Sequence, residues 1–287
     1  MMRRRTYSVI SVTLLALAVL VTVLLVVYGA YTIANAVRSL QIAFGCVFGV
    51  AAICYFLLPP DVLAHECGHM ACGALTGMRF PVVRIGRLEF SKTGVRYRLS
   101  VTTAGETAIV PRGAKRMRLR VFVTALGGPL FSVAYGVTML ALFWAYPAAP
   151  AIFFFALFAP LSLYNGIVAL LPAELDGSRT DGAVMRGIIR QDAETDVTFR
   201  VLQAQGILTK GTYADVPREL LFGAPVVRED CRAFAALLFL QYEYAKFHGD
   251  AAGAAAALSR LRSIEDYLTD EERKFLANEK DPAVAGS

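Results

Sequence analysis

Residues 121–173 read VFVTALGGPLFSVAYGVTMLALFWAYPAAPAIFFFALFAPLSLYNGIVALLPA and contain no Asp, Glu, Lys or Arg. A helix needs about 20 apolar residues to cross about 30 Å of hydrocarbon, so this stretch is long enough for two crossings. Tyr146-Pro147-Ala148-Ala149-Pro150 lies near its middle, and its prolines are typical of a turn. We therefore predict one membrane span over about 120–145 and another over 151–171.

Two further stretches, residues 6–37 and 39–60, also lack charged side chains and are long enough to cross a membrane. We predict spans over 7–37 and 41–58. The chain of 287 residues is 18% charged, against about a quarter in soluble domains. These features predict an all-α polytopic membrane protein with about four transmembrane helices. The first apolar run is longer than a secretory signal core, so we expect residues 1–40 to remain as an N-terminal anchor.

The basic residues are placed where they would orient the spans. The chain begins Met-Met-Arg-Arg-Arg, and between Gly77 and Leu119 ten Lys or Arg face only two acids, Glu89 and Glu106. Short basic segments beside spans stay cytoplasmic, and four crossings put both basic segments and the C-terminal third on that side. The net charge of +6 is then an orientation signal, and no nucleic-acid partner is expected. We expect a multi-pass protein with both termini cytoplasmic, in a bacterial plasma membrane.

The remaining segments have distinct characters. The span at 41–58 is interrupted by Pro59-Pro60 and is expected to resume as a helix over 61–76, with Asp61 as its N-cap and Gly77 closing it. Residues 80–111 alternate partly and contain Lys92-Thr93-Gly94, which predicts a β-hairpin. We expect a membrane core over 41–190. Residues 191–287 predict a helical cytoplasmic domain, with helices over 232–248, 251–267 and 269–279 and a tetratricopeptide-like turn at Gly249-Asp250.

The sequence Ala64-His65-Glu66-Cys67-Gly68-His69-Met70 contains the pattern His-Glu-x-x-His. On a helix, His65 and His69 share a face and present two imidazole nitrogens to one metal ion. Glu66 is rotated by about 100°, so it reaches a metal-bound water without being a ligand. Zinc lowers the pKa of such a water towards about 7, and the carboxylate then takes its proton as a general base. The alternative is a polar cluster without a catalytic role.

A third protein ligand is expected, because catalytic zinc usually has three protein ligands and a water. The third and last histidine of the chain, His248, lies far away in the C-terminal region, and the cysteines lie in apolar segments or off the ligand face. A carboxylate after the fourth span is therefore the expected ligand. The candidates there are Glu174, Asp176 and Asp181, of which Asp176 and Asp181 are each followed by a glycine that lets the backbone bend.

Three segments together resemble the site-2 protease family of intramembrane zinc metalloproteases. Residues 65–78 are similar to its His-Glu-x-Gly-His element, Leu126-Gly-Gly-Pro-Leu-Phe-Ser132 to its Gly-Pro-Leu-x-Asn element, and 170–182 to its Asn-x-x-Pro…Ser-Asp-Gly element. The resemblance covers about 41–190 and implies Zn²⁺ held by His65, His69 and Asp181, with Asp176 as the alternative third ligand. The Asn of the last element falls on Ala169. Asn165, one turn earlier, is the expected stand-in for positioning the substrate.

Three functions follow from these features. The favoured one is hydrolysis of a peptide bond in a membrane-anchored protein or peptide, with the hairpin pairing with an unwound substrate strand. The second is a catalytically silent binding or maturation factor that retains the protease fold. The third is a zinc transporter or sensor, which would need polar residues along several spans, whereas spans one and three have few. The C-terminal helices are expected either to dock a cytoplasmic protein partner or only to fold on themselves.

Overall fold

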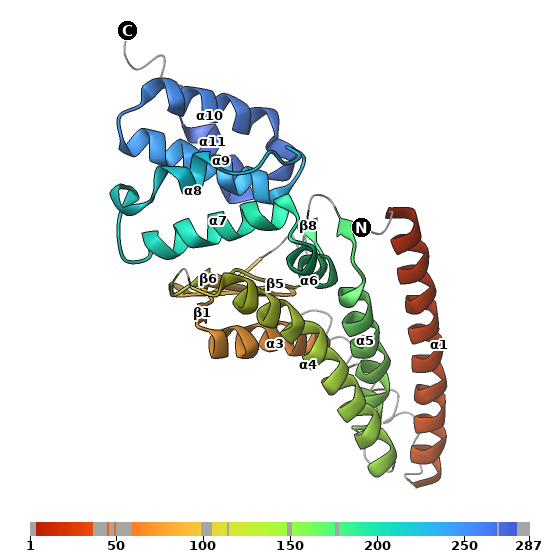
Figure 1. The fold of residues 1–287 in the computed structure, drawn as a ribbon. Coiled ribbons are helices and arrows are strands. Elements are labelled where there is room, and N and C mark those ends of the chain that lie inside the picture. The colour runs from red at the N-terminus through yellow and green to blue at the C-terminus, as the bar shows by residue number, and fades with distance from the viewer. Residues whose placement is uncertain are drawn as a thin grey trace.

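The computed structural model describes residues 4–36, 45, 49, 59–98, 105–113, 115–147, 151–175, 178–268 and 270–279. Most of these residues are helical, with small antiparallel sheets and a C-terminal helical region. Figure 1 shows three parts. Long helices form one end of the molecule, a short helix and small sheets lie beside them, and a group of shorter helices forms the other end.

Three helices are long and apolar enough to span a membrane, namely α1 (Arg4–Ala36), α4 (Met117–Ala145) and α5 (Ile152–Leu170). They confirm the spans expected at 7–37, 120–145 and 151–171, and they make the chain a multi-pass membrane protein. The fourth expected span, at 41–58, lies outside the described residues apart from two isolated positions. Helix α5 packs between α1 and α4, and the hydroxyls of Ser11 and Tyr164 are 2.9 Å apart across the α1–α5 contact.

Helix α3 (Pro60–Thr76) carries the two histidines and crosses α4. It confirms the helix expected over 61–76 and ends at Gly77 in the left-handed conformation, with φ of 85°. The expected N-cap was wrong. Pro59 is the N-cap and Pro60 is the first helical residue, where the missing N–H and fixed φ of proline suit a helix start. Asp61 is instead buried inside the first turn and accepts a hydrogen bond from Asn165 Nδ2 of α5.

The segment expected to form one hairpin over 80–111 forms a larger structure. A four-stranded antiparallel sheet has the order β4-β3-β2-β5, and β1 pairs with β6 beside it. The part of the segment before Lys92, which a single hairpin would use as one strand, forms two strands, because Gly86 adopts a φ of 56° and turns the chain back. The strand bounds are β1 (Met78–Arg79), β2 (Val82–Ile85), β3 (Leu88–Ser91), β4 (Gly94–Tyr97), β5 (Gly105–Thr107) and β6 (Val110–Pro111).

After α5 the chain forms a short hairpin, β7 (Glu174–Leu175) and β8 (Ser178–Arg179), and then α6 (Asp181–Arg190). The C-terminal helices follow, and they confirm the expected helical region and its antiparallel pair α9–α10. Their bounds are α7 (Ala193–Leu208), η1 (Tyr213–Asp215), α8 (Arg218–Phe222), α9 (Arg232–Phe247), α10 (Ala251–Ser263), η2 (Glu265–Tyr267) and α11 (Asp270–Asn278).

The C-terminal helices are joined to the membrane helices by a shared hydrophobic core. Phe199 and Leu202 of α7 pack with Met117 and Val121 at the start of α4, together with Met78 of β1. These contacts hold α7 against the N-terminal end of α4, because burial of each large apolar side chain contributes about 1.5–3 kcal/mol.

The crossing of α3 and α4 depends on two glycines. A Cβ atom on Gly127 would overlap the carbonyl oxygen of Gly68, and a Cβ atom on Gly68 would overlap that of Gly127. The two helix backbones are therefore in direct contact, as small residues allow at helix interfaces in membranes.

We expect Gly127→Val to lower the resistance of the purified protein to unfolding by SDS or heat. The added side chain must push α3 and α4 apart, and overpacking of this kind costs about 1–3 kcal/mol. Leu126→Val, at a position that is 37% exposed on the same helix, is the matched control and should unfold like the unaltered protein. Equal stability of the Gly127 variant would contradict the backbone contact.

Candidate metal centre

The two histidines and one aspartate meet at a single point. His65 Nε2 and His69 Nε2 are 3.1 Å apart. Asp181, the first residue of α6, places one carboxylate oxygen 3.2 Å from His65 Nε2 and the other 3.5 Å from His69 Nε2. Ligand atoms around tetrahedral zinc lie about 3.3–3.6 Å from one another, given metal–ligand distances of about 2.0–2.2 Å. The three distances lie inside this range or within about 0.2 Å of it, so the groups are close enough together to bind one metal ion.

The outer nitrogen of each imidazole is held by α4. His69 Nδ1 donates a hydrogen bond to the carbonyl oxygen of Thr124 at 2.7 Å, and His65 Nδ1 shares a hydrogen bond with Ser132 Oγ at 2.9 Å. Both Thr124 and Ser132 are buried. Partners of this kind fix the ring orientation of metal-binding histidines, so the Nε2 atoms are left facing the common point.

Gly128 of α4 leaves the space in which an ion would lie. A Cβ atom there would overlap Nε2 of His69 and come within 2.7 Å of Nε2 of His65. Any side chain at this position would thus fill the point on which the imidazoles converge. The close approach is possible because Gly127, the preceding residue, brings the two helix backbones together.

Asp181 is held by the start of α6. Thr180 caps the helix, because its Oγ1 accepts a hydrogen bond from the backbone N–H of Ala183 and donates one to the carbonyl oxygen of Leu171. Burial alone would raise the pKa of Asp181, but hydrogen bonds from His65 and His69 outweigh burial and hold the pKa below its usual range. The carboxylate is therefore negatively charged, as a metal ligand must be.

Glu66 is 4% exposed and lies beneath strand β5. Thr107 Oγ1 donates a hydrogen bond to its carboxylate, and a Cβ atom on Gly105 would overlap that carboxylate. Glu66 and both imidazoles line a cavity of about 380 Å³, which β5, α4 and α6 enclose further. The carboxylate of Glu66, which is not one of the three candidate ligands, thus lies in the same cavity as the two imidazoles.

The other candidate residues that the structure describes lie outside the group formed by His65, His69 and Asp181. Asn165 hydrogen-bonds to Asp61 and is not among the residues that line the cavity, whereas Ala169 is. Glu174 pairs with Arg228 and so faces the C-terminal helices. Asp176 lies outside the described residues. His248 lies at the end of α9, with its ring stacked 4.3 Å from that of Tyr244.

Several site residues were not found from the sequence. Thr107, Gly105 and Thr124 lie in no motif, and only the fold brings them to Glu66 and His69. Ser132 was noted only as a departure from an Asn, yet it contacts His65 directly. A signal for Gly128 was present, since the pair Gly127-Gly128 in an apolar span indicates a close helix contact.

Comparisons of the chain with models of protein families, with curated proteins and with solved structures find no match.

We expect purified protein to bind one Zn²⁺ per chain, to lose it in Asp181→Ala and to retain it in Asp176→Ala. The reason is that Asp181 contacts both imidazoles, so its loss leaves only two protein ligands. Metal analysis after dialysis at equal protein concentration measures the difference. Loss of zinc from the Asp176 variant alone would overturn the ligand assignment.

We also expect Gly128→Ala to bind zinc at least about tenfold more weakly, because the added methyl group occupies the metal position. Competition with a chelating dye gives the affinity. Gly113→Ala is the matched control, since a Cβ atom there meets nothing within 4 Å. Unchanged zinc binding by the Gly128 variant would show that the ion lies elsewhere.

Proposed function

We propose that this protein is an intramembrane zinc metalloendopeptidase that hydrolyses peptide bonds of membrane-anchored substrates. The observation that carries the proposal is the position of Asp181, whose two oxygens lie 3.2 and 3.5 Å from the two imidazoles of the His-Glu-x-x-His helix. The resemblance of residues 65–78, 126–132 and 170–182 to elements of the site-2 protease family supports the same activity and the same ligand.

The ligand set suits Zn²⁺ rather than a hard cation. Two imidazole nitrogens and one carboxylate are a set of three protein ligands of the kind that catalytic zinc sites use. Bound zinc supplies Lewis acidity that polarises a carbonyl group and acidifies water. His65, His69 and Asp181 would hold the ion, and Ser132 and Thr124 hold the two rings in place.

Glu66 is the residue placed to move the proton. Its carboxylate follows His65 directly on α3, so it lines the same cavity without competing for the ligand position. It takes a proton from the attacking water and delivers it to the nitrogen of the leaving amine, as a general base and then a general acid. The hydrogen bond from Thr107 holds the carboxylate in one orientation for both steps.

The surroundings of the site favour a substrate that is itself in the membrane. Helix α3 packs against α4 and α5, two of the long apolar helices, so the cavity lies beside the spans. Exclusion of bulk water from such a site strengthens each electrostatic interaction with the reacting groups. A peptide must lose its helical hydrogen bonds before water attacks it there, and the small sheet offers backbone groups with which an extended segment pairs.

We expect Glu66→Gln to bind zinc normally and to lose at least about a hundredfold in hydrolysis, because the amide removes the proton acceptor and keeps the size of the side chain. A fluorescently tagged single-span reporter, reconstituted with the protein in vesicles, gives the cleavage rate. Glu243→Gln on α9 is the matched control. Equal activity of the Glu66 variant, or full rescue by it of cells lacking the protein, would instead support a silent binding or maturation factor.

A further inference from the structure

The hairpin β7–β8 is the only connection along the chain between span α5 and the ligand Asp181. Contacts with the last residue of α5 and with Ala173, just after that helix, fix one side of the hairpin. The backbone N–H of Thr180 donates a hydrogen bond to the carbonyl oxygen of Ala173. A Cβ atom on Gly182 would overlap the carbonyl oxygen of Leu170. The start of α6 is thus pressed against the end of α5. The opposite side of the hairpin and of α6 faces the C-terminal helices.

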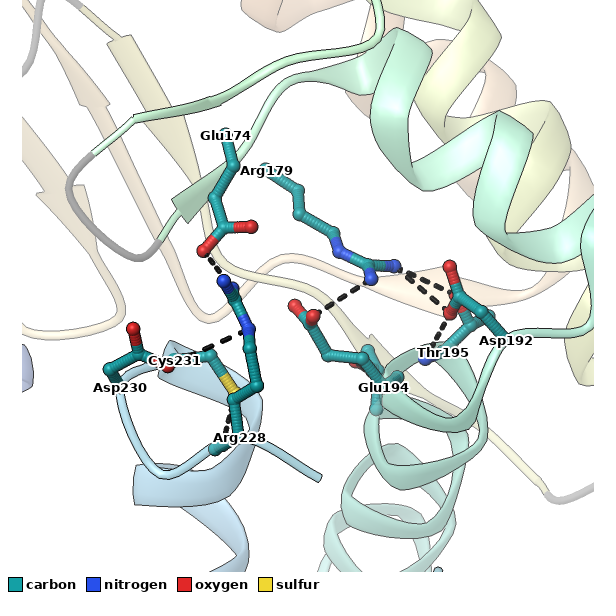
Figure 2. Close-up of polar contacts among 9 residues, drawn as sticks. Glu174, Arg179, Asp192, Glu194, Thr195, Arg228, Asp230 and Cys231 are labelled. Atoms are coloured by element: carbon teal, nitrogen blue, oxygen red, sulfur yellow. Dashed lines mark hydrogen bonds and ion pairs between the residues drawn. The ribbon is translucent and has the colours of Figure 1, made fainter. Parts of the chain in front are cut away.

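Arg179 of β8 reaches across α6 to the first turn of α7, as Figure 2 shows. Its Nη1 donates to Asp192 Oδ1 at 3.2 Å and to Thr195 Oγ1 at 3.0 Å, and its Nη2 donates to Glu194 Oε2 at 2.8 Å. The guanidinium lies against Gly187, where a Cβ atom would be 2.7 Å from Nη1. Helix α6 is therefore clamped between the hairpin and α7 by this one side chain.

The Arg179 side chain is 14% exposed, and this burial gives the contacts their strength. Its Nε has no hydrogen-bond partner among the described residues, so the orientation of the guanidinium is set by the acceptors on α7. Hydrogen bonds between charged groups are stronger than those between neutral groups. Removing either side would leave the other charge buried without its partner, which is strongly unfavourable.

The first strand of the hairpin, β7, contacts the C-terminal region at another point. Glu174 of β7 forms an ion pair with Arg228, which also lies 3.5 Å from Asp230 (Figure 2). The carbonyl oxygen of Arg228 accepts a hydrogen bond from Cys231 Sγ, and Cys231 is fully buried in the core of α9 and α10. Because Arg228 is 54% exposed, this pair is the weaker of the two attachments.

We propose that Arg179 is a positioning residue for the metal ligand Asp181, and that the helix α7 of the C-terminal region is thereby a structural part of the metal centre. Arg179 lies two residues before Asp181, so a shift of the hairpin moves the carboxylate relative to the imidazoles of α3. Movements of less than an ångström matter here, because zinc accepts ligand distances within about 0.2 Å of their usual values. The inference rests on the proposed function for what the metal does.

Because α7 packs on the start of α4, the contacts of Arg179 with α7 connect all three parts of the site. The histidines come from α3, their orienting groups from α4, and the carboxylate from a segment that α7 holds. A protein that binds the C-terminal helices and displaces α7 would, on this proposal, weaken the metal site without touching it. That gives the C-terminal region a role in the chemistry beyond folding on itself.

The test is the zinc affinity of full-length variants in detergent, measured by competition with a chelating dye and without any substrate. We expect Arg179→Ala to weaken zinc binding at least about tenfold, as loss of groups that orient ligands does. Arg179→Lys should be intermediate, because lysine keeps the charge but lacks the planar fork that reaches both acids. Cobalt(II)-loaded Arg179→Ala should also show an altered visible spectrum, which a merely structural staple would not produce.

Arg200→Ala is the matched control. Arg200 lies on α7 and pairs with Asp196 at 2.8 Å, and its hydrogen bonds involve none of the described residues of the hairpin. The zinc affinity of Arg200→Ala should stay within about twofold of that of the unaltered protein. If Arg179→Ala does not fold, Glu194→Gln decides the question, since it keeps the shape of the acceptor and removes its charge. Severalfold weaker zinc binding by Glu194→Gln supports the proposal.

Zinc affinity within about twofold of the unaltered protein in folded Arg179→Ala, or in Glu194→Gln if the first variant is unfolded, would overturn the inference. Asp181→Ala, measured in parallel, separates this outcome from failure of the proposed function. If Asp181→Ala loses zinc while Arg179→Ala keeps it, the metal site stands and only the clamp is wrong. If Asp181→Ala keeps zinc, the ligand assignment and the inference both fail.

Discussion

Helices α3 and α4 touch backbone to backbone at Gly68 and Gly127, and every other part of the centre depends on that contact. At this distance the carbonyl oxygen of Thr124 and the hydroxyl of Ser132 reach the outer nitrogens of the two imidazoles. The next residue, Gly128, then lies under the inner nitrogens and leaves room for an ion. Helices with larger residues at the crossing would be separated by a layer of side chains, and the histidines would lose the partners that orient them.

Burial of polar groups beside the membrane is expensive, and the structure balances it by pairing them. Glu66 accepts a hydrogen bond from Thr107, and Asp61 accepts one from Asn165. The imidazoles meet the carboxylate of Asp181. Each of these polar side chains therefore has a partner on a different element, so the site also fixes how α3, α5, α6 and the sheet are placed. A cluster of this kind specifies one arrangement of the fold as well as one arrangement of reactive groups.

The C-terminal helices are tied into the same arrangement rather than attached through a flexible linker. Apolar side chains seat α7 on the start of α4, and the guanidinium of Arg179 joins α7 to the hairpin before Asp181. The apolar contacts between α7 and α4 are strong but do not fix an orientation. The hydrogen bonds of Arg179 do fix one, because they depend on direction. Together they hold Asp181, at the start of α6, in a fixed position relative to the two histidines of α3. In Figure 1, α6 lies between the membrane helices and the C-terminal helices, and α7 is on the side of the C-terminal group that faces α6.

Local patterns in the sequence were enough to predict three described spans, the helix over 61–76 and the helix pair α9–α10. Apolar runs, prolines and glycines determine such helices and their ends through residues that are close together in the chain. The His-Glu-x-x-His spacing likewise placed two imidazoles on one helix face by itself. Local patterns misplaced the cap of α3, since Pro60 starts the helix before Asp61, and they merged β2 and β3, because the turn depends on the positive φ of Gly86. Only the tertiary structure decided that Asp181 meets the imidazoles, that Thr107 contacts Glu66 and that Arg179 holds α7. Each of these contacts joins groups far apart in the chain, so it depends on how the helices pack rather than on the spacing of residues.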